Sequence, residues 1–105
     1  MADVETLRVI HIDAAGGVIA VEDYPGNASA VALPLRRVIG DALRLDTRGL
    51  ILSHNHPGGD PQPSAADRAA TSLLARVAAA LGIRVHDHLI RGGGRCVSFR
   101  QLGLL

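Results

Sequence analysis

The sequence predicts an α/β domain in which helices cover a β-sheet in two or three layers. Segments with strand character alternate with two segments of helical period, in the order strand, strand, helix, strand, helix, strand, strand. Residues 49–53 form a short continuous apolar run, which is typical of a strand buried on both faces. At 105 residues the chain has room for a modest core, and we expect residues 1–105 to form one domain.

The first half of the chain predicts a hairpin followed by a helix. Residues 7–13 and 18–22 are rich in β-forming residues and flank the turn-forming segment 14–17. The Pro-Gly-Asn sequence at 25–27 breaks this hairpin. From Pro34 to about Asp46 the apolar residues recur at helical spacing, and the predicted buried stripe is Leu35, Val38, Ile39, Ala42 and Leu43.

The second half predicts a strand, a helix and a closing pair of strands. The loop 57–63 contains two glycines and three prolines and should be rigid. A helix is expected from Ser64 to Leu81, where Gly82 ends it. Strands at 83–90 and 95–98 follow, joined by a turn at 91–94. The predicted buried stripe of the helix is Ala70, Leu73, Leu74, Val77 and Leu81.

Composition excludes several classes of protein. The net charge is only +1, and Tyr24 and Phe99 are the only aromatic residues, so a strong nucleic-acid surface is not expected. The single cysteine, Cys96, excludes an intramolecular disulfide and a Cys-ligated zinc finger. Neither a secretory signal nor a membrane-spanning run is present, so we expect a cytoplasmic protein that does not bind membranes.

A cluster of metal-ligand residues follows the buried strand. His54 and His56 are two residues apart, so their side chains point to the same side of a strand. After seven intervening residues, the sequence Ser64-Ala65-Ala66-Asp67 can supply a carboxylate as third ligand, leaving a fourth position for water, as in a catalytic zinc site. The same four residues also fit a helix capping box, and both interpretations can hold together.

A catalytic metal site also needs a group that accepts the proton of the attacking water. Three acids on the predicted strands ahead of the histidines are candidates, namely Asp13, Glu22 and Asp23. Glu22 ends its strand, so it could reach across a neighbouring strand towards the metal. The alternative is a solvated acid on an edge strand.

These residues together resemble the JAMM motif of the JAB/MPN metalloprotease superfamily. The sequence His54-Asn55-His56-Pro57, with Gly59, Pro63, Ser64 and Asp67, is similar to the RadC-like branch, as are the segments 87–90 and 97–99. The resemblance covers about residues 7–103. It implies a mixed β-sheet flanked by helices, similar to the fold of cytidine deaminases.

The resemblance also implies the chemistry. It makes His54, His56 and Asp67 ligands of Zn²⁺, Glu22 the general base and acid, and Ser64 a residue that stabilises the oxyanion. The implied activity is hydrolysis of a peptide or isopeptide bond in a peptide or protein substrate. His/His/Asp ligands can also hold iron, cobalt or manganese.

Two other functions stay open at this point. RadC-like proteins carry a historical DNA-repair label, which makes a DNA-associated module one alternative, and a non-catalytic protein-interaction module is another. RadC-like proteins usually have Ser where this chain has Gly58, and a helical segment often precedes their domain. We therefore expect a bare catalytic-type module, as a piece trimmed from a longer protein would be.

Residues 86–88 offer a further cluster. His86 and His88 alternate along a predicted strand and are expected on one face, with Asp87 opposite. They fit a second metal pair, ordinary satisfied histidines, or support for a metal ligand through a hydrogen bond from His88 or Asp87.

Overall fold

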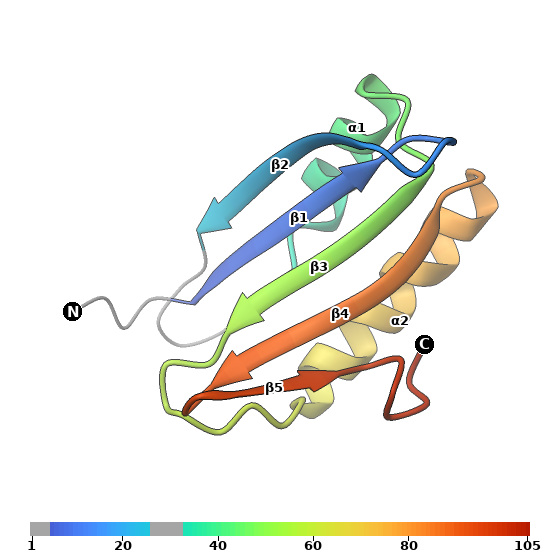
Figure 1. The fold of residues 1–105 in the computed structure, drawn as a ribbon. Helices are drawn as coiled ribbons and strands as arrows, with labels where there is room; N and C mark the ends of the chain where they lie inside the picture. The colour runs from blue at the N-terminus through green and yellow to red at the C-terminus, as the bar shows by residue number, and fades with distance from the viewer. Residues whose placement is uncertain (1–4, 26–32) are drawn as a thin grey trace.

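The computed structural model describes residues 5–25 and 33–105, and it contains one mixed sheet and two helices (Figure 1). The order of elements along the chain is the predicted one. Their bounds are β1 (Thr6–Ile12), β2 (Val18–Pro25), α1 (Leu35–Arg44), β3 (Gly49–Asn55), α2 (Ala65–Ala80), β4 (Arg84–Gly92) and β5 (Arg95–Ser98). The predicted α/β fold is therefore confirmed.

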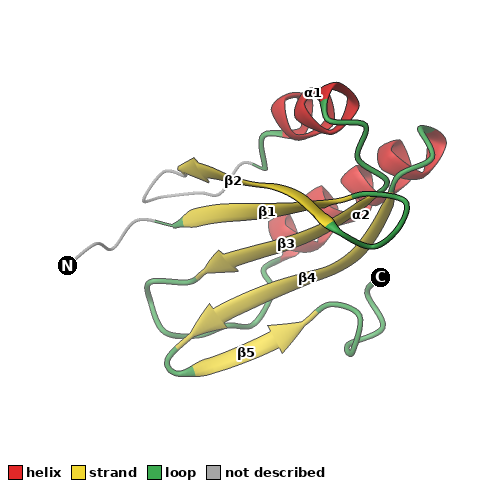
Figure 2. Cartoon of the chain, turned by 45° about the horizontal axis from the view of Figure 1, so that its top comes forward, coloured by secondary structure: helices red, strands yellow, loops and turns green. Residues whose placement is uncertain are grey.

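The strands lie in the order β2-β1-β3-β4-β5. β3 and β4 are parallel, and every other neighbouring pair is antiparallel. Because β1 runs opposite to both β2 and β3, α1 and α2 each connect parallel strands and cross the sheet in the same direction. Right-handed crossovers then require both helices on one face. Figures 1 and 2 show this two-layer arrangement in the described part of the chain.

The core lies between the sheet and the two helices. Fully buried Val9, Leu50 and Leu52 come from the central strands β1 and β3. They belong to one apolar cluster with Val38 and Ala42 of α1 and with Leu74 and Ala78 of α2. Alternation along β1 and β3 therefore places every second side chain under the helices, and His54 is the last in its row.

The buried stripe of α2 differs from the predicted one. Leu73 and Leu81 are 43% and 46% exposed, and the same holds for Leu43 of α1, which is 57% exposed. The buried positions of α2 are Asp67, Thr71, Leu74 and Ala78. The prediction considered only apolar residues. It was wrong here because the first turns of α2 bury the polar side chains of Asp67 and Thr71 near the end of β3.

A β-bulge in β4 separates two histidines that we expected on one face. The register runs from Leu50 opposite Val85 directly to Ile51 opposite Asp87, so His86 is the extra residue. His88 is buried, whereas the His86 ring lies over Gly49, with Nε2 2.5 Å from where a Cβ of that residue would be. The expectation of one shared face is therefore wrong.

The predicted break at 25–27 falls, beyond Pro25, outside the described residues. Neither α1 nor α2 is long and apolar enough to cross a membrane.

Candidate metal site

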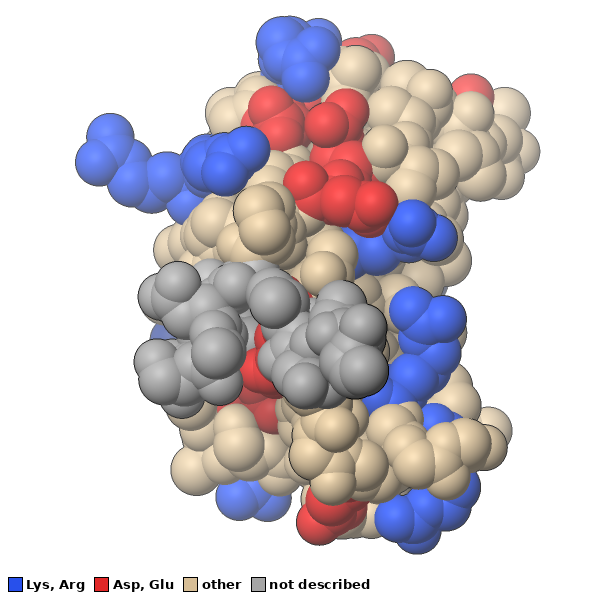
Figure 3. Space-filling view, turned by 90° about the vertical axis from the view of Figure 1, so that its left-hand side faces the viewer, with Lys and Arg blue, Asp and Glu red and all other residues tan. Residues whose placement is uncertain are grey.

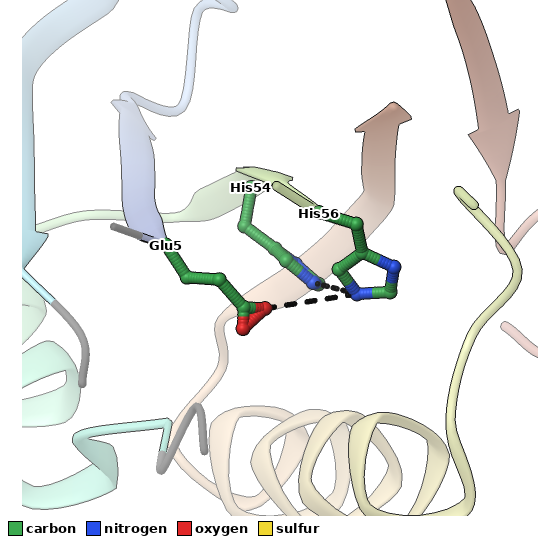
Figure 4. Close-up of side chains that lie close together, drawn as sticks. All are labelled: Glu5, His54 and His56. Atoms are coloured by element: carbon green, nitrogen blue, oxygen red, sulfur yellow. Dashed lines mark hydrogen bonds and ion pairs between the residues drawn. The ribbon is translucent and has the colours of Figure 1, made fainter. Parts of the chain in front are cut away.

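The site forms where β3 ends, and two imidazoles define it. His54 is 1% exposed and His56 is half-buried. Their Nε2 atoms lie 2.9 Å apart, so the two rings present the same nitrogen to one point (Figure 4). The two-residue spacing at the end of β3, where His56 directly follows the last strand residue, produces this convergence, because both side chains point towards the helices.

A carboxylate from the start of β1 joins the two histidines. In the antiparallel pairing of β1 with β3, Leu7 lies opposite His54, and the same register extended by two residues brings Glu5 opposite His56. Oε1 of Glu5 lies 3.8 Å from Nε2 of His56. Ligand atoms of Glu5, His54 and His56 all lie within 4.8 Å of one another, so this group could bind a metal ion (Figure 4).

Asp67 approaches the same point from the first turn of α2. The backbone N–H of Ser64 donates to Oδ2 of Asp67 over 2.9 Å, and the backbone N–H of Asp67 donates to Oγ of Ser64 over 2.9 Å. This capping box fixes the carboxylate. Its Oδ2 lies 3.3 Å from Nε2 of His56, and its Oδ1 lies 3.9 Å from Nε2 of His54. One side chain therefore starts the helix and faces both imidazoles.

The other nitrogen of each imidazole has its own partner. Nδ1 of His54 lies 2.6 Å from Nε2 of His88, and Nδ1 of His56 lies 2.7 Å from the carbonyl oxygen of Asp60. A carbonyl oxygen only accepts, so Nδ1 of His56 carries a hydrogen, and in the neutral ring Nε2 is left with a free lone pair. Such outer partners are what orient a metal-binding histidine.

Burial and charge set the protonation of the site. Burial lowers the pKa of His54 to about 4 and that of His88 to about 3, so both rings are neutral near pH 7. Burial alone would raise the pKa of Asp67, but the hydrogen bonds from Ser64 and the nearby histidines hold it below its ordinary value. Burial also raises the pKa of Glu5, with His56 opposing this shift. The site thus combines the neutral imidazole of His54 with one carboxylate whose pKa is lowered, that of Asp67, and one whose pKa is raised, that of Glu5.

The sequence-predicted residues fall into two groups. The structure brings His54, His56, Asp67 and Ser64 together. Glu22 is not in this group. It lies on β2, where it pairs with Val9 of β1, and β2 is the edge strand two positions from β3, which places it roughly 10 Å from β3 across the sheet.

Sequence reasoning missed Glu5. A signal was present, since Glu5 lies two residues before Leu7 and so shares its inward parity on the first strand. That signal becomes readable only once β1 is known to pair antiparallel with β3.

The donor set fits a divalent metal ion. Neutral imidazole nitrogens and carboxylate oxygens are the ligands that zinc accepts, and two histidines with one carboxylate are a known set for a catalytic zinc. The side of the molecule where β3 and β4 end shows both basic and acidic groups on its visible surface (Figure 3).

Comparison with known proteins gives a consistent result. Residues 1–104 match the family described as the RadC-like JAB domain. The chain is 47% identical over 102 residues to a UPF0758 protein of Rhodobacter capsulatus, covering 96% of this chain and 48% of that protein. It is 42% identical over 103 residues to UPF0758 protein STH371 of Symbiobacterium thermophilum, covering 97% and 44% respectively. The chain thus spans about half the length of these curated relatives.

Proposed function

Because this chain belongs to the RadC-like JAB domain family, we propose that it is a zinc-dependent hydrolase of peptide or isopeptide bonds. The observation that carries this proposal is the convergence of two Nε2 atoms, 2.9 Å apart, with the carboxylates of Asp67 and Glu5 beside them. When bound, Zn²⁺ lowers the pKa of a coordinated water and polarises a carbonyl oxygen.

The two carboxylates are suited to different tasks. Asp67 is held by Ser64 and has a lowered pKa, which suits a constant ligand beside His54 and His56. Glu5 is half-buried and has a raised pKa, which suits a group that accepts and returns a proton. We assign Glu5 to take a proton from the attacking water and to deliver it to the leaving amine.

Ser64 is proposed to stabilise the oxyanion. Its Oγ accepts the backbone N–H of Asp67, so its hydroxyl hydrogen is free to donate elsewhere. Ser64 is exposed at the start of α2, beside the metal ligands, where a substrate carbonyl can approach. A hydroxyl donor there would supplement the polarisation of the carbonyl.

The test compares two glutamates. Wild type, Glu5→Gln and Glu22→Gln are loaded with Zn²⁺, their metal content is measured, and hydrolysis of a fluorogenic peptide library and of an isopeptide-linked peptide pair is followed. We expect Glu5→Gln to keep the metal and to lose at least ~10²-fold in rate, the low end for acid–base catalysis. Glu22→Gln should remain active.

Two results would contradict this proposal. Loss of rate in Glu22→Gln alone would return the general base to the residue predicted from the sequence. Zinc-loaded wild type that cleaves neither kind of bond would contradict the hydrolase proposal.

A further inference from the structure

A chain of three buried side chains leads away from the metal site. Nδ1 of His54 lies 2.6 Å from Nε2 of His88, and Nδ1 of His88 lies 2.8 Å from Oγ1 of Thr71. These three residues are 1%, 3% and 1% exposed, respectively. Because none of them contacts bulk water appreciably, their polar side-chain atoms need hydrogen-bond partners inside the protein.

Three different elements of the fold position this series of hydrogen-bonded side chains. His54 lies one residue before the end of β3, His88 lies on the parallel neighbour β4, and Thr71 lies one turn after Asp67 on α2. The Phe99 ring stacks on His88 with centroids 4.6 Å apart and planes 15° apart. The β4 bulge turns His88, rather than His86, towards the helix. The orientation of the His88 ring is therefore set before any metal binds.

The connectivity allows only two hydrogen-bond directions when both imidazoles are neutral. In one, His88 donates from Nε2 to His54, and Nε2 of His54 carries a hydrogen. In the other, His54 donates from Nδ1 to His88, and His88 donates from Nδ1 to Thr71. Only the second direction leaves Nε2 of His54 with the lone pair that a metal requires. A hydroxyl donates and accepts, so Thr71 can end the chain in either direction.

We propose that His88 and Thr71 are positioning residues that hold His54 with its hydrogen on Nδ1, so that Nε2 is presented to the metal. This inference rests on the proposed metal site but not on any particular hydrolytic activity. His88 touches neither the metal position nor a substrate in this role. It acts through His54.

The chain supplies a matched control. His11 is also fully buried, and its Nδ1 lies 2.9 Å from Oγ1 of Thr47, as His88 faces Thr71. His11 lies on β1 opposite Leu50, four residues along the strand from Leu7, which lies opposite His54. Replacing either histidine removes a buried imidazole and a hydrogen bond to threonine, but only His88 supports a metal ligand.

The experiment measures Zn²⁺ affinity by competition with a chromogenic chelator, alongside unfolding of the metal-free protein in denaturant. We expect His88→Leu to weaken Zn²⁺ binding by ~10–100-fold, the range for lost outer partners of metal ligands. His88→Gln, whose amide oxygen can accept from Nδ1 of His54, should restore affinity to within a few fold of wild type. His11→Leu should lower stability and leave Zn²⁺ affinity unchanged.

Each outcome separates the two proposals. Equal Zn²⁺ affinities of His88→Leu and His11→Leu would overturn the positioning role while leaving the metal site intact. Zinc binding without hydrolysis would remove the proposed activity and leave the positioning role standing, and a wild type that binds no Zn²⁺ would overturn both. If His88→Leu does not fold, Thr71→Val serves instead, and an unchanged affinity in that variant counts against the proposal.

Discussion

Asp67 combines a structural and a chemical role in one carboxylate. Its Oδ2 accepts the Ser64 backbone N–H and lies 3.3 Å from Nε2 of His56. In Asp67→Asn the amide oxygen can keep the capping bond, but the negative charge beside the imidazoles is lost. We therefore expect Zn²⁺ affinity to fall by more than the ~10–100-fold caused by losing an outer partner.

Chelator competition measures this change. Asp60→Asn is the control, because among the described residues the Asp60 carboxylate accepts only from the Gln62 backbone N–H, and its carbonyl oxygen, which faces His56, is retained. Equal affinities in the two variants would argue against Asp67 as a ligand.

The residues of the site differ in how far the sequence could predict them. His54, His56 and Asp67 depend on local rules, namely strand alternation and the start of a helix, and the structure brings them together. The position of Glu5 beside the histidines depends on the pairing of β1 with β3. Residues that meet at this end of the two strands are far apart in the sequence: the backbone N–H of Thr6 donates to the side chain of Asn55, 49 residues later. Glu22 has the same kind of side chain but lies on the edge strand β2, a position that alternation alone could not reveal, because alternation does not give strand order.

At the scale of elements, the N-terminus of α2 should contribute measurable stability. Ser64→Ala removes the acceptor for the Asp67 backbone N–H, and loss of such a cap costs ~1 kcal/mol of unfolding free energy. Denaturant unfolding of the metal-free protein measures it. Ser72→Ala, at an exposed position inside the same helix, should be neutral or slightly stabilising because Ala favours helix. Similar losses in both variants would contradict the capping role.

The turn of the β4–β5 hairpin packs against the loop that follows His56. A Cβ at Gly93 would lie 2.5 Å from the carbonyl oxygen of Gly59, whereas a Cβ at Gly94 would meet nothing within 4 Å. Both glycines have positive φ, so either substitution by alanine costs roughly 1–2 kcal/mol of stability. Only Gly93→Ala should also displace the loop next to Asp60, whose carbonyl oxygen faces His56, and so weaken Zn²⁺ binding.

Comparing the Zn²⁺ affinities of Gly93→Ala and Gly94→Ala isolates the contact from the backbone strain. Equal affinities would show that the hairpin does not support the site. The sequence indicated a turn at 91–94 but not this contact, since the packing of one loop on another is not encoded in periodicity. The β4 bulge was missed for the same reason, because nothing in the sequence marks His86 as the extra residue.

At the scale of the whole molecule, the fold buries three imidazoles on the helix-covered side of the sheet. Burial lowers the pKa of His11, that of His54 to about 4 and that of His88 to about 3, from an ordinary value of 6.5. Below pH 6.5 the unfolded chain therefore binds more protons than the folded one, and stability must fall as the pH decreases. Each unit of pKa difference corresponds to ~1.4 kcal/mol.

We therefore expect the unfolding free energy of the metal-free protein to decrease steadily between pH 6.5 and 5. Aspartates with lowered pKa, such as Asp41, reduce the unfolding free energy only as the pH falls below about 3.8, their ordinary value. Glu5, whose pKa is raised in the folded chain, acts in the opposite direction to the histidines. Urea unfolding at a series of pH values, with chelator present, measures the slope. His11→Leu should flatten it, because one buried imidazole no longer titrates. A stability that is constant or rises towards pH 5 would mean that these rings accept protons as readily in the folded chain as in the unfolded one.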